Sequence, residues 1–367
     1  MICTRYSLWN FRNLEPVEIQ LSSGMNLFTG RNAQGKTNLL EAVYLCSTGR
    51  SHRPVRDQEM IRRGESSARV DLTTLHRDGT HLLRLELAKG SKKKVIINNH
   101  PAARLHQLMT HCNTVIFSPE DMELIKDGPQ FRRRFLDISL SQISSSYFRR
   151  LQQYQAILYQ RNALLKRCLR AGRWDEVQLS LWEDTLADAG AEIVAARRHM
   201  MDGLSPRVAE VHARLSGGKE VLSLEYTTAC KGTAAGEIAA SIRELYTTHR
   251  ERERREGTTL TGPHRDDIKI TLDSLDIRAY GSQGQQRTAV LAMKFALLGM
   301  METATGERPI LLLDDVTSEL DAFRSKALGE YLTNSQTIIT CTDASRLPFF
   351  EARIFTVENG TVSRTGD

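Results

Sequence analysis

The 367-residue sequence contains no apolar run near the roughly 20 residues that a membrane-spanning helix needs, so we expect no transmembrane segment. Its first residues lack the basic-then-apolar arrangement of a secretory signal peptide. The six cysteines are scattered, and no CxxC pair occurs among them. That spacing is typical of buried thiols in a reducing compartment and argues against a disulfide framework or a zinc site. We therefore expect a cytoplasmic protein that makes no membrane contact.

The composition is that of a folded globular protein, with 40% hydrophobic and 26% charged residues and enough length for two domains. The net charge of +6 is unevenly distributed. Residues 131–173 contain a single acid, Asp137, and ten basic residues: Arg132, Arg133, Arg134, Arg149, Arg150, Arg161, Lys166, Arg167, Arg170 and Arg173. This excess indicates either a solvated helical face or a surface that binds nucleic acid.

The clearest motif is the segment GRNAQGKT, which spans Gly30 to Thr37. An apolar run, Met25–Thr29, precedes it, and a helical pattern over Asn38–Leu45 follows. A strand, a glycine-bounded loop and a helix form the context in which GxxxxGK[ST] is a phosphate-binding loop. The glycines allow backbone N–H groups to converge on an anion, and the helix dipole adds positive charge there. We predict a bound nucleoside triphosphate, with Lys36 on the outer phosphates and the Thr37 hydroxyl on a magnesium ion.

A second acidic site is predicted where the aliphatic run Pro309–Leu313 ends in Asp314 and Asp315. In a magnesium–nucleotide site one carboxylate holds the ion and a second orients or deprotonates the attacking water. We assign Asp314 to the metal and Asp315 to the base. Two acids that cap a following helix are the alternative interpretation.

The segment SQGQ, residues 282–285, has two compatible interpretations. Ser282 followed three residues later by Gln285 forms a capping box for the helix behind it. A helix N-terminus with a glycine and a serine is also suited to receive a terminal phosphate. Ser282, Gln283, Gly284 and Gln285 are therefore candidate phosphate ligands.

Further candidates surround these motifs. Arg12 and Asn13 lie in a turn close in sequence to the phosphate-binding loop, where they either reach the nucleotide or lie on the surface. The candidate nucleotide-binding residues are thus Arg12, Asn13, Gly30, Arg31, Asn32, Ala33, Gln34, Gly35, Lys36, Thr37 and Asn38. The candidate DNA contacts come from two places. The first is a lysine-rich turn, Lys92, Lys93 and Lys94, which is equally explained as a solubilising sheet edge. The second is the 131–173 stretch, with Arg149, Arg150 and Arg167.

Hydrophobic periodicity predicts an α/β protein with a helical insertion. The first part of the chain has strands at 2–9, 17–21, 25–29, 68–75, 81–87, 94–98 and 115–117, of which the fourth to sixth form an antiparallel meander. Helical patterns cover 120 to about 170, 174 to about 215, and 236–256. Mixed α/β structure then returns, with strands at 222–226, 268–272, 309–315 and 336–341, helices at 288–301 and from Ser318, and a hairpin of residues 354–357 and 361–363.

The order of the motifs resembles the layout of ABC-type ATPases. The phosphate-binding loop comes first, a long helical insertion follows, and SxGQ, LLLDD and SELD come after it. The chain is most similar to the SMC-like branch of these ATPases and, within it, to the RecF-like family of recombination-repair proteins. The segments that carry the resemblance are FRN at 11–13, GRNAQGKTN at 30–38, GRSHR at 49–53, FSPED at 117–121, RRRFLD at 132–137, TGPHRDD at 261–267, GSQGQQR at 281–287 and LLLDDVTSELD at 311–321.

The resemblance implies an ABC-ATPase head, with a mixed sheet around the phosphate-binding loop and an antiparallel β subdomain, plus an inserted α-helical arm. The head would comprise 1–120 and 258–367, and the arm 121–257. It also implies an ATP-dependent homodimer in which residues 282–285 of one chain cover the nucleotide of the other. The implied cofactors are ATP and Mg2+. The implied partners are gapped DNA and single-strand/double-strand junctions, and RecR, with RecO and RecA in the same pathway.

Three departures from the broader ABC pattern indicate a weak ATPase that acts as a switch, and we expect DNA to stimulate it. Asp315 stands where most relatives carry glutamate, Thr342-Asp343 where many carry histidine, and FSPED in the region of a glutamine-bearing loop. We expect turnover below the enzyme median of about 10 per second. The alternatives are an SMC-like structural chromosome ATPase, which would need a far longer heptad region, a transporter ATPase subunit, and a small-molecule kinase, in which SxGQ and SELD would have no role.

Overall fold

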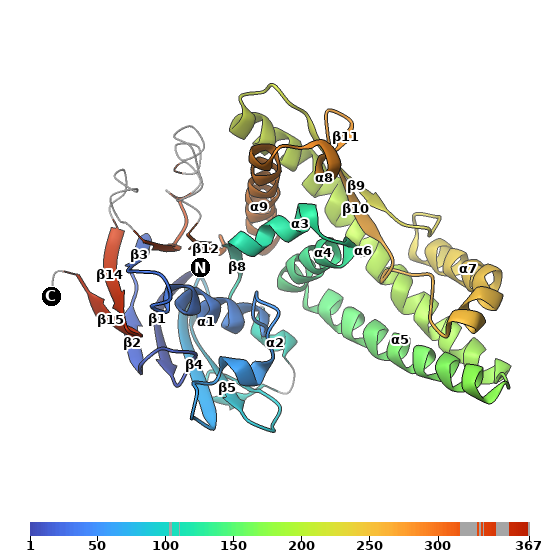
Figure 1. Cartoon of the computed structure of the whole chain (residues 1–367), viewed down its shortest axis with the longest axis horizontal. Coiled ribbons are helices and arrows are strands. Elements are labelled where there is room, and N and C mark those ends of the chain that lie inside the picture. The colour runs from blue at the N-terminus through green and yellow to red at the C-terminus, as the bar shows by residue number, and fades with distance from the viewer. Residues whose placement is uncertain are drawn as a thin grey trace. The chain divides into compact units, whose positions relative to one another are not determined.

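The computed structural model describes residues 1–102, 105–109, 111–315, 329, 332, 334–342 and 352–365 (Figure 1). The chain divides into two compact units. The first consists of Met1–Met122, Glu210–Lys219 and Arg287–Asp367, and the second of Glu123–Ala209 and Glu220–Gln286. The first boundary, after residue 122, lies close to the expected end of the first head segment, but the later boundaries differ from those expected for the head and the arm. The division into a head and an arm stays a prediction.

The first unit contains a mixed six-stranded sheet in the order β15-β14-β3-β13-β12-β8. Its strands are β3 (Met25–Thr29), β8 (Thr114–Phe117), β12 (Ile310–Asp314), β13 (Thr337–Cys341), β14 (Ala352–Glu358) and β15 (Thr361–Arg364). All neighbours are parallel except the predicted β14–β15 hairpin. Strands β8, β12 and β13 are buried throughout, as expected for parallel strands covered on both faces. Their register pairs Asp314 with Thr340, and Thr340 with Phe28, at the carboxyl ends.

A second six-stranded sheet, entirely antiparallel, has the order β2-β1-β4-β5-β6-β7. Its strands are β1 (Ile2–Trp9), β2 (Val17–Gln20), β4 (Ser67–His76), β5 (Gly79–Ala88), β6 (Lys94–Ile97) and β7 (His100–Pro101). Alternate residues such as Leu8, Val70 and Leu85 enter the core, and their neighbours form a polar outer face. The predicted meander is confirmed.

Helix α1 (Lys36–Thr48) packs into a core that contains side chains from both sheets. Every residue from Leu39 to Thr48 is buried. A helix that is apolar on nearly all sides is stable only when it is covered on all sides. The packing therefore fixes the N-terminus of α1 beside the carboxyl end of β3, the strand that precedes the loop. Two short helices, η1 (Asp57–Met60) and α2 (His106–Met109), complete this part of the chain.

The second unit combines helices with a three-stranded antiparallel sheet, β11-β10-β9. Its strands are β9 (Leu222–Thr227), β10 (Asp267–Leu272) and β11 (Leu275–Asp276). Its helices are α3 (Glu123–Lys126), α4 (Pro129–Ile143), α5 (Ser145–Ala171), most of α6 (Glu176–Ser216), α7 (Ala235–Glu256) and α8 (Ile277–Tyr280). Helix α9 (Gln283–Thr305) begins in this unit and continues in the first.

The helical pattern expected from residue 120 to about 170 corresponds to several elements and not to one continuous helix. A 3-10 turn, η2 (Pro119–Met122), comes first. Pro129 occupies the start of α4, where its missing N–H costs nothing. The Ser144 side chain accepts a hydrogen bond from the Tyr147 N–H and caps α5. The start of the apolar helix expected at 288 was wrong, since α9 begins at Gln283. The helix expected from Ser318 lies outside the described residues.

Arg132, in the basic stretch, and Arg197, which lies outside it, have structural roles. Arg132 is buried and makes a two-pronged ion pair with Asp267, at 2.7 and 3.0 Å. Arg197 bonds the carboxylate of Asp137 and the carbonyl oxygen of Pro263. The RRRFLD and TGPHRDD segments thus bind to each other.

Among the described helices, none combines the length and apolar character needed to cross a bilayer.

We predict that Arg161→Leu destabilises the protein strongly. Arg161 is 1% exposed and contacts Glu183 at 2.9 Å and Glu253 at 2.5 Å. Its removal leaves the buried Glu253 without the guanidinium that pairs with it, although Glu183 keeps its ion pair with Arg250. A buried carboxylate without a counter-charge costs about 3–5 kcal/mol of unfolding free energy in a urea titration. Arg243→Leu is the matched control, because Arg243 also contacts two acids but at an exposed site, and should cost no more than about 1 kcal/mol. Equal losses would contradict this account.

A second prediction concerns pH. Burial lowers the pKa of His264 to about 4, and its ring accepts from the Tyr154 hydroxyl and donates to the Thr259 carbonyl oxygen as a neutral imidazole. Between pH 6.5 and about 4 the His264 ring is protonated in the unfolded chain and neutral in the folded chain. The unfolding free energy therefore decreases as the pH is lowered through this range, by up to about 3 kcal/mol. His264→Gln should flatten this dependence and leave the part due to His52, whose pKa burial also lowers to about 4. An unchanged slope would exclude His264 as its source.

Candidate nucleotide-binding site

The loop between β3 and α1 requires glycine at both ends. Gly30 has φ of 153°, and a Cβ there would lie 2.2 Å from the carbonyl oxygen of Val357. Gly35 has φ of 111° and precedes α1 as its N-cap, where a Cβ would lie 2.7 Å from the Leu14 side chain. No side chain caps α1. Its first N–H groups and its positive dipole end are therefore presented at the loop, which is the arrangement that binds phosphate.

Lys36 closes this loop on itself. Its Nζ donates hydrogen bonds to the carbonyl oxygens of Gly30 at 2.6 Å and Arg31 at 2.8 Å. Burial lowers the pKa of Lys36, against the opposing charges of Asp315 and Asp314. An anionic phosphate in the loop would therefore be favoured, because it supplies the negative charge that this half-desolvated ammonium lacks.

Thr37 and the acidic pair meet at the carboxyl ends of three strands. The Thr37 hydroxyl donates to Asp314 Oδ1 at 2.9 Å, and the Thr340 hydroxyl donates to the same oxygen at 2.7 Å. Burial raises the pKa of Asp314, partly offset by these bonds. Asp315 follows with φ of 51°, its N–H directed at Thr340. This left-handed backbone conformation follows the last residue of β12, and both acids line the same cavity.

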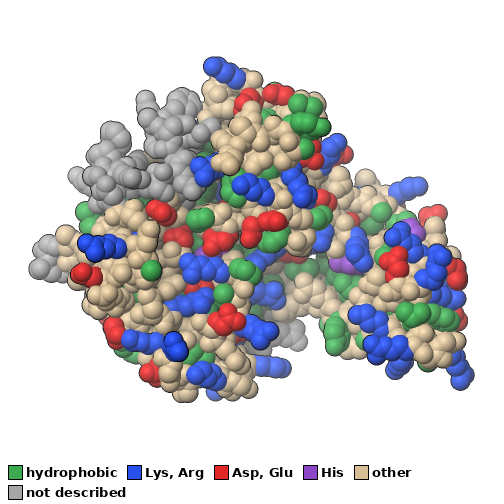
Figure 2. All heavy atoms as spheres, in the orientation of Figure 1, with side chains coloured by type: hydrophobic (Ala, Val, Ile, Leu, Met, Phe, Trp, Pro, Cys, Tyr) green, Lys and Arg blue, Asp and Glu red, His purple; other side chains and the backbone are tan. Residues whose placement is uncertain are grey.

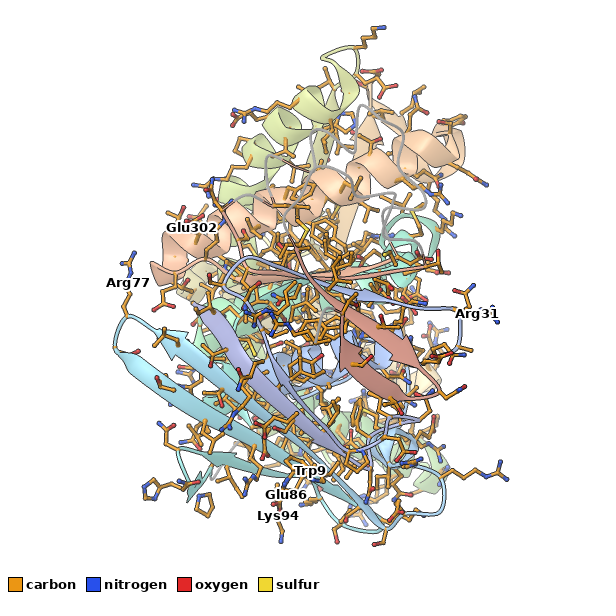
Figure 3. All side chains as sticks on the ribbon, turned by 90° about the vertical axis from the view of Figure 1, so that its left-hand side faces the viewer. Trp9, Arg31, Arg77, Glu86, Lys94 and Glu302 are labelled. Atoms are coloured by element: carbon orange, nitrogen blue, oxygen red, sulfur yellow. The ribbon has the colours of Figure 1, made fainter. Side chains whose placement is uncertain are left out.

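A cavity of about 380 Å³ opens over these groups. Its lining residues are Asn32, Ala33, Gly35, Lys36, Thr37, Asn38, Arg53, Asp314, Asp315 and Thr340. Most of the predicted nucleotide-binding residues are therefore brought together. Five of them do not line the cavity: Arg12, Asn13, Gly30, Arg31 and Gln34. The Arg31 side chain extends outward (Figure 3), and Gln34 Oε1 accepts from the Asn359 N–H. Their contact with a nucleotide stays a prediction.

Arg12 instead bonds a buried acid of α1. Its guanidinium donates to the two carboxylate oxygens of Glu41 at 2.8 and 2.6 Å, and to the carbonyl oxygen of Glu59. The Ser51 hydroxyl donates to Glu41 at 2.5 Å. Burial opposes ionisation of Glu41, but the bonds from Arg12 and Ser51 outweigh it and lower its pKa. The FRN and GRSHR segments thus hold α1 in position through one carboxylate.

Asn13 acts in the same way at the first turn of α1. Its side-chain oxygen accepts from the Asn38 amide at 2.7 Å, and Arg53 donates to Asn38 at 3.2 Å. Arg53 and Thr340 line the cavity, and sequence reasoning assigned neither to the site. The basic GRSHR loop was the available signal for Arg53, whereas Thr340 depends on strand register. The FSPED loop lies near the acids, because Ser118 and Asp121 line a small cavity of about 50 Å³ with Asp314 and Asp315.

The SQGQ segment starts α9 and belongs to the second unit. The Ser282 N–H donates to Gln285 Oε1 at 2.7 Å, and the Gln285 N–H donates to Ser282 Oγ at 3.3 Å. The predicted capping box is confirmed. Gln285 also donates to Glu220. Ser282 and Gln283 are exposed, so a group outside this chain can reach this helix N-terminus. The phosphate contact of residues 282–285 stays a prediction.

The candidate DNA contacts differ in their surroundings. Lys93 is occupied, since its Nζ donates to the carbonyl oxygen of Gly49 and contacts Asp57 at 2.9 Å. Arg150 pairs with Glu192 at 2.6 Å. Lys92 and Lys94, which lie on either side of Lys93, are exposed, and so is Arg149. Arg167 donates a hydrogen bond to Gln178. Figure 2 shows Lys and Arg side chains interspersed with Asp and Glu over the face in view. Their role in DNA binding stays a prediction.

The donor set suits a magnesium ion that is shared with a ligand. Thr37 and Asp314 offer a hydroxyl and a buried carboxylate of raised pKa, which a cation would stabilise in its charged form. Within the described residues, no group of three or more His, Cys, Asp or Glu side chains is arranged to hold a metal. Mg2+ is usually held by one or two carboxylates together with substrate phosphates, so this limited set is sufficient.

The fold and this site define a P-loop ATPase of the ABC and SMC-head class. Residues 3–362 match the family described as the RecF/RecN/SMC N terminal domain. The Smc head bound to the C-winged helix domain of ScpA superposes with a TM-score of 0.59 at 16% identity, over 100% of this chain and 97% of that one, which shows the shared fold. The predicted fold class is confirmed.

The chain belongs to the RecF family of DNA replication and repair proteins. It is 41% identical to RecF of Halothermothrix orenii over 99% of both chains, and 40% identical to RecF of Limosilactobacillus reuteri over the same shares. The solved structure of the recombination mediator protein RecF with ATP in the RecFOR pathway superposes with a TM-score of 0.93, at 34% identity over 99% of this chain and 97% of that one. The predicted resemblance is confirmed.

We predict that Arg12 acts through Glu41. Arg12→Ala leaves a carboxylate of 0% exposure without its guanidinium, which should cost about 3 kcal/mol of unfolding free energy and weaken nucleotide binding. Glu41→Gln should have a similar effect, and the double variant should lose less than the sum. If Arg12 contacted the nucleotide directly, Arg12→Ala would weaken binding without changing the unfolding free energy in urea.

Proposed function

We propose that the protein binds ATP with magnesium at the cavity over α1 and uses it to switch between monomer and dimer. The observation that carries the proposal is the hydrogen bond between Thr37 and Asp314, which joins the phosphate-binding loop to the acidic strand end. The ATP-bound RecF structure, which covers nearly the whole chain at 34% identity, supports the same ligand.

Each residue of the site would have a separate role in ATP binding and hydrolysis. The N–H groups of the loop and Lys36 would hold the outer phosphates, and Lys36 would exchange its two backbone carbonyl partners for phosphate oxygens. Thr37 and Asp314 would hold the magnesium ion, which when bound neutralises charge on the phosphate oxygens. Asp315 would orient and deprotonate the attacking water. Lys36 and Thr37 lie on the first turn of α1 and Asp314 ends β12, so these three side chains are held by the packed core.

The second chain would complete the site. Ser282 and Gln283 are exposed at the N-terminus of α9, and this helix end offers N–H donors suited to a terminal phosphate. A phosphate bound both by the loop of one chain and by residues 282–285 of another would hold the two chains together. The dimer would therefore form in ATP and separate after hydrolysis.

Hydrolysis would be slow and stimulated by DNA. The base, Asp315, is one methylene shorter than the glutamate of most ABC relatives, and the FSPED loop provides no glutamine beside the acids. Asp343, which stands where many relatives carry histidine, lies outside the described residues. A site of this kind favours a long-lived closed state over rapid turnover.

In the cell the closed dimer would bind gapped DNA and single-strand/double-strand junctions in the cytoplasm. It would work with RecR and RecO to load RecA, in line with the RecFOR pathway of the solved relative. The structural chromosome ATPase is less well supported, because the longest described helix, α6, has 41 residues and spans only about 60 Å.

We predict that ATP with Mg2+ doubles the mass measured by light scattering. Lys36→Ala should lose nucleotide binding and stay monomeric, because the charge that holds the outer phosphates is removed. Asp315→Asn should bind ATP, dimerise and remain dimeric, because hydrolysis is blocked. A wild-type chain that binds ATP but keeps a monomer mass at all protein concentrations would exclude the ATP-driven dimer. Turnover well above about 10 per second would exclude the slow switch.

A further inference from the structure

A trough of about 500 Å³ lies on the antiparallel sheet of the first unit, and the nucleotide site does not account for it. The residues that matter among its lining are Trp9, Arg69, Glu86, Ser91, Lys92 and Lys94. Strand register aligns four of them in one row, since Trp9 pairs with Arg69, Arg69 with Glu86, and Glu86 with Lys94. Figure 3 shows Trp9, Glu86 and Lys94 gathered at one end of the sheet, with Arg77 at the other.

The row provides a rigid aromatic surface. The guanidinium carbon of Arg69 lies 3.6 Å from the centroid of the Trp9 ring. Asp71 lies 3.6 Å from Arg69 and binds Arg84 at 2.8 Å, so a carboxylate attracts the guanidinium in addition to the ring. An indole and a guanidinium held in this way are the groups on which unpaired nucleobases stack, and such stacking tolerates any base sequence.

The rim of the trough provides phosphate-binding charge. Lys92 and Lys94 are exposed, and within the part of the chain that the structure describes no ion pair neutralises either of them. Lys93, between them, is turned to the opposite side and bonds Gly49 and Asp57. Glu86 adds a carboxylate that can accept from the exocyclic amino group of a base. Three cations and one acid around an aromatic ring suit a single strand better than a duplex, whose bases are stacked and covered.

The segments that line the trough also hold α1. Trp9 ends β1, and the chain continues directly to Arg12, which binds the buried Glu41 of α1. Lys93 binds the carbonyl oxygen of Gly49, the residue that caps the C-terminus of α1. A ligand that fixes residues 9 and 92–94 therefore acts on the two segments that position the phosphate-binding helix.

We propose that this trough binds the unpaired strand of a gapped DNA, with a base stacked on Trp9 and the flanking phosphates on Lys92 and Lys94. The proposal rests on the proposed DNA-binding function and assigns the part of the substrate that this surface recognises.

The test is the affinity of the full chain, with ATP and Mg2+, for a fluorescently labelled single strand of mixed sequence and for its blunt duplex. Lys92→Ala/Lys94→Ala should weaken single-strand binding about tenfold or more and reduce the slope of log affinity against log salt by about 1.4, since each single-strand phosphate contact contributes about 0.7. Trp9→Ala should weaken it roughly fivefold or more, and Trp9→Phe should retain most of the affinity. Duplex affinity should change little.

The matched control is Arg77→Ala/Lys89→Ala, which removes two exposed charges from the same sheet outside the trough. An equal loss in this control, or single-strand affinity unchanged in both trough variants, would overturn the proposal while leaving DNA binding intact. A wild-type chain that binds neither probe would overturn the proposed function as well. Equal loss of duplex and single-strand affinity would also contradict recognition of the unpaired strand. Thermal unfolding of each variant identifies any loss that arises from misfolding.

Discussion

The burial of α1 between two sheets is the constraint on which the site depends. The helix is covered on nearly all sides, so its N-terminus cannot shift relative to the carboxyl ends of β3 and β12. The charged residue Glu41 is fully buried with it, and a buried carboxylate must be paired. Arg12 and Ser51 supply that pairing from two separate loops. The packing of a single helix thus determines the position of the phosphate-binding loop and of the loops that flank it.

Sequence patterns predicted the parts of the site that are local in the chain. The phosphate-binding loop, the acidic strand end and the capping box at Ser282 each depend on a few adjacent residues, and each has the predicted local structure. Thr340 was missed because its role comes from the register of β13 between β3 and β12, which no local pattern contains. Arg53 belongs to GRSHR, a segment that carries the family resemblance, but its place in the cavity depends on how that segment folds back on α1.

The function of the charged residues was harder to predict from the sequence than the function of the motifs. The basic stretch of residues 131–173 contains Arg132 and Arg161, which are buried and bind acids far along the chain. Composition counts a buried, paired arginine and an exposed one alike, although only the exposed one attracts DNA. Helix periodicity likewise gave the right class of structure for this stretch, but the breaks at Pro129 and Ser144 depend on local capping. The outer face of the antiparallel sheet had the weakest sequence signal, since its row of Trp9, Arg69, Glu86 and Lys94 exists only through strand pairing.

The central claim is that one ATP site is completed by two chains, and cysteine cross-linking tests it most directly. The six native cysteines are all buried, so the background reaction is low. A chain with Asn32→Cys, in the loop, is mixed with a differently tagged chain carrying Ser282→Cys, and a short bis-maleimide is added. The account predicts a product containing both tags that forms with ATP and Mg2+ and not without nucleotide. Absence of that product in ATP, with both chains shown to bind ATP, would contradict it.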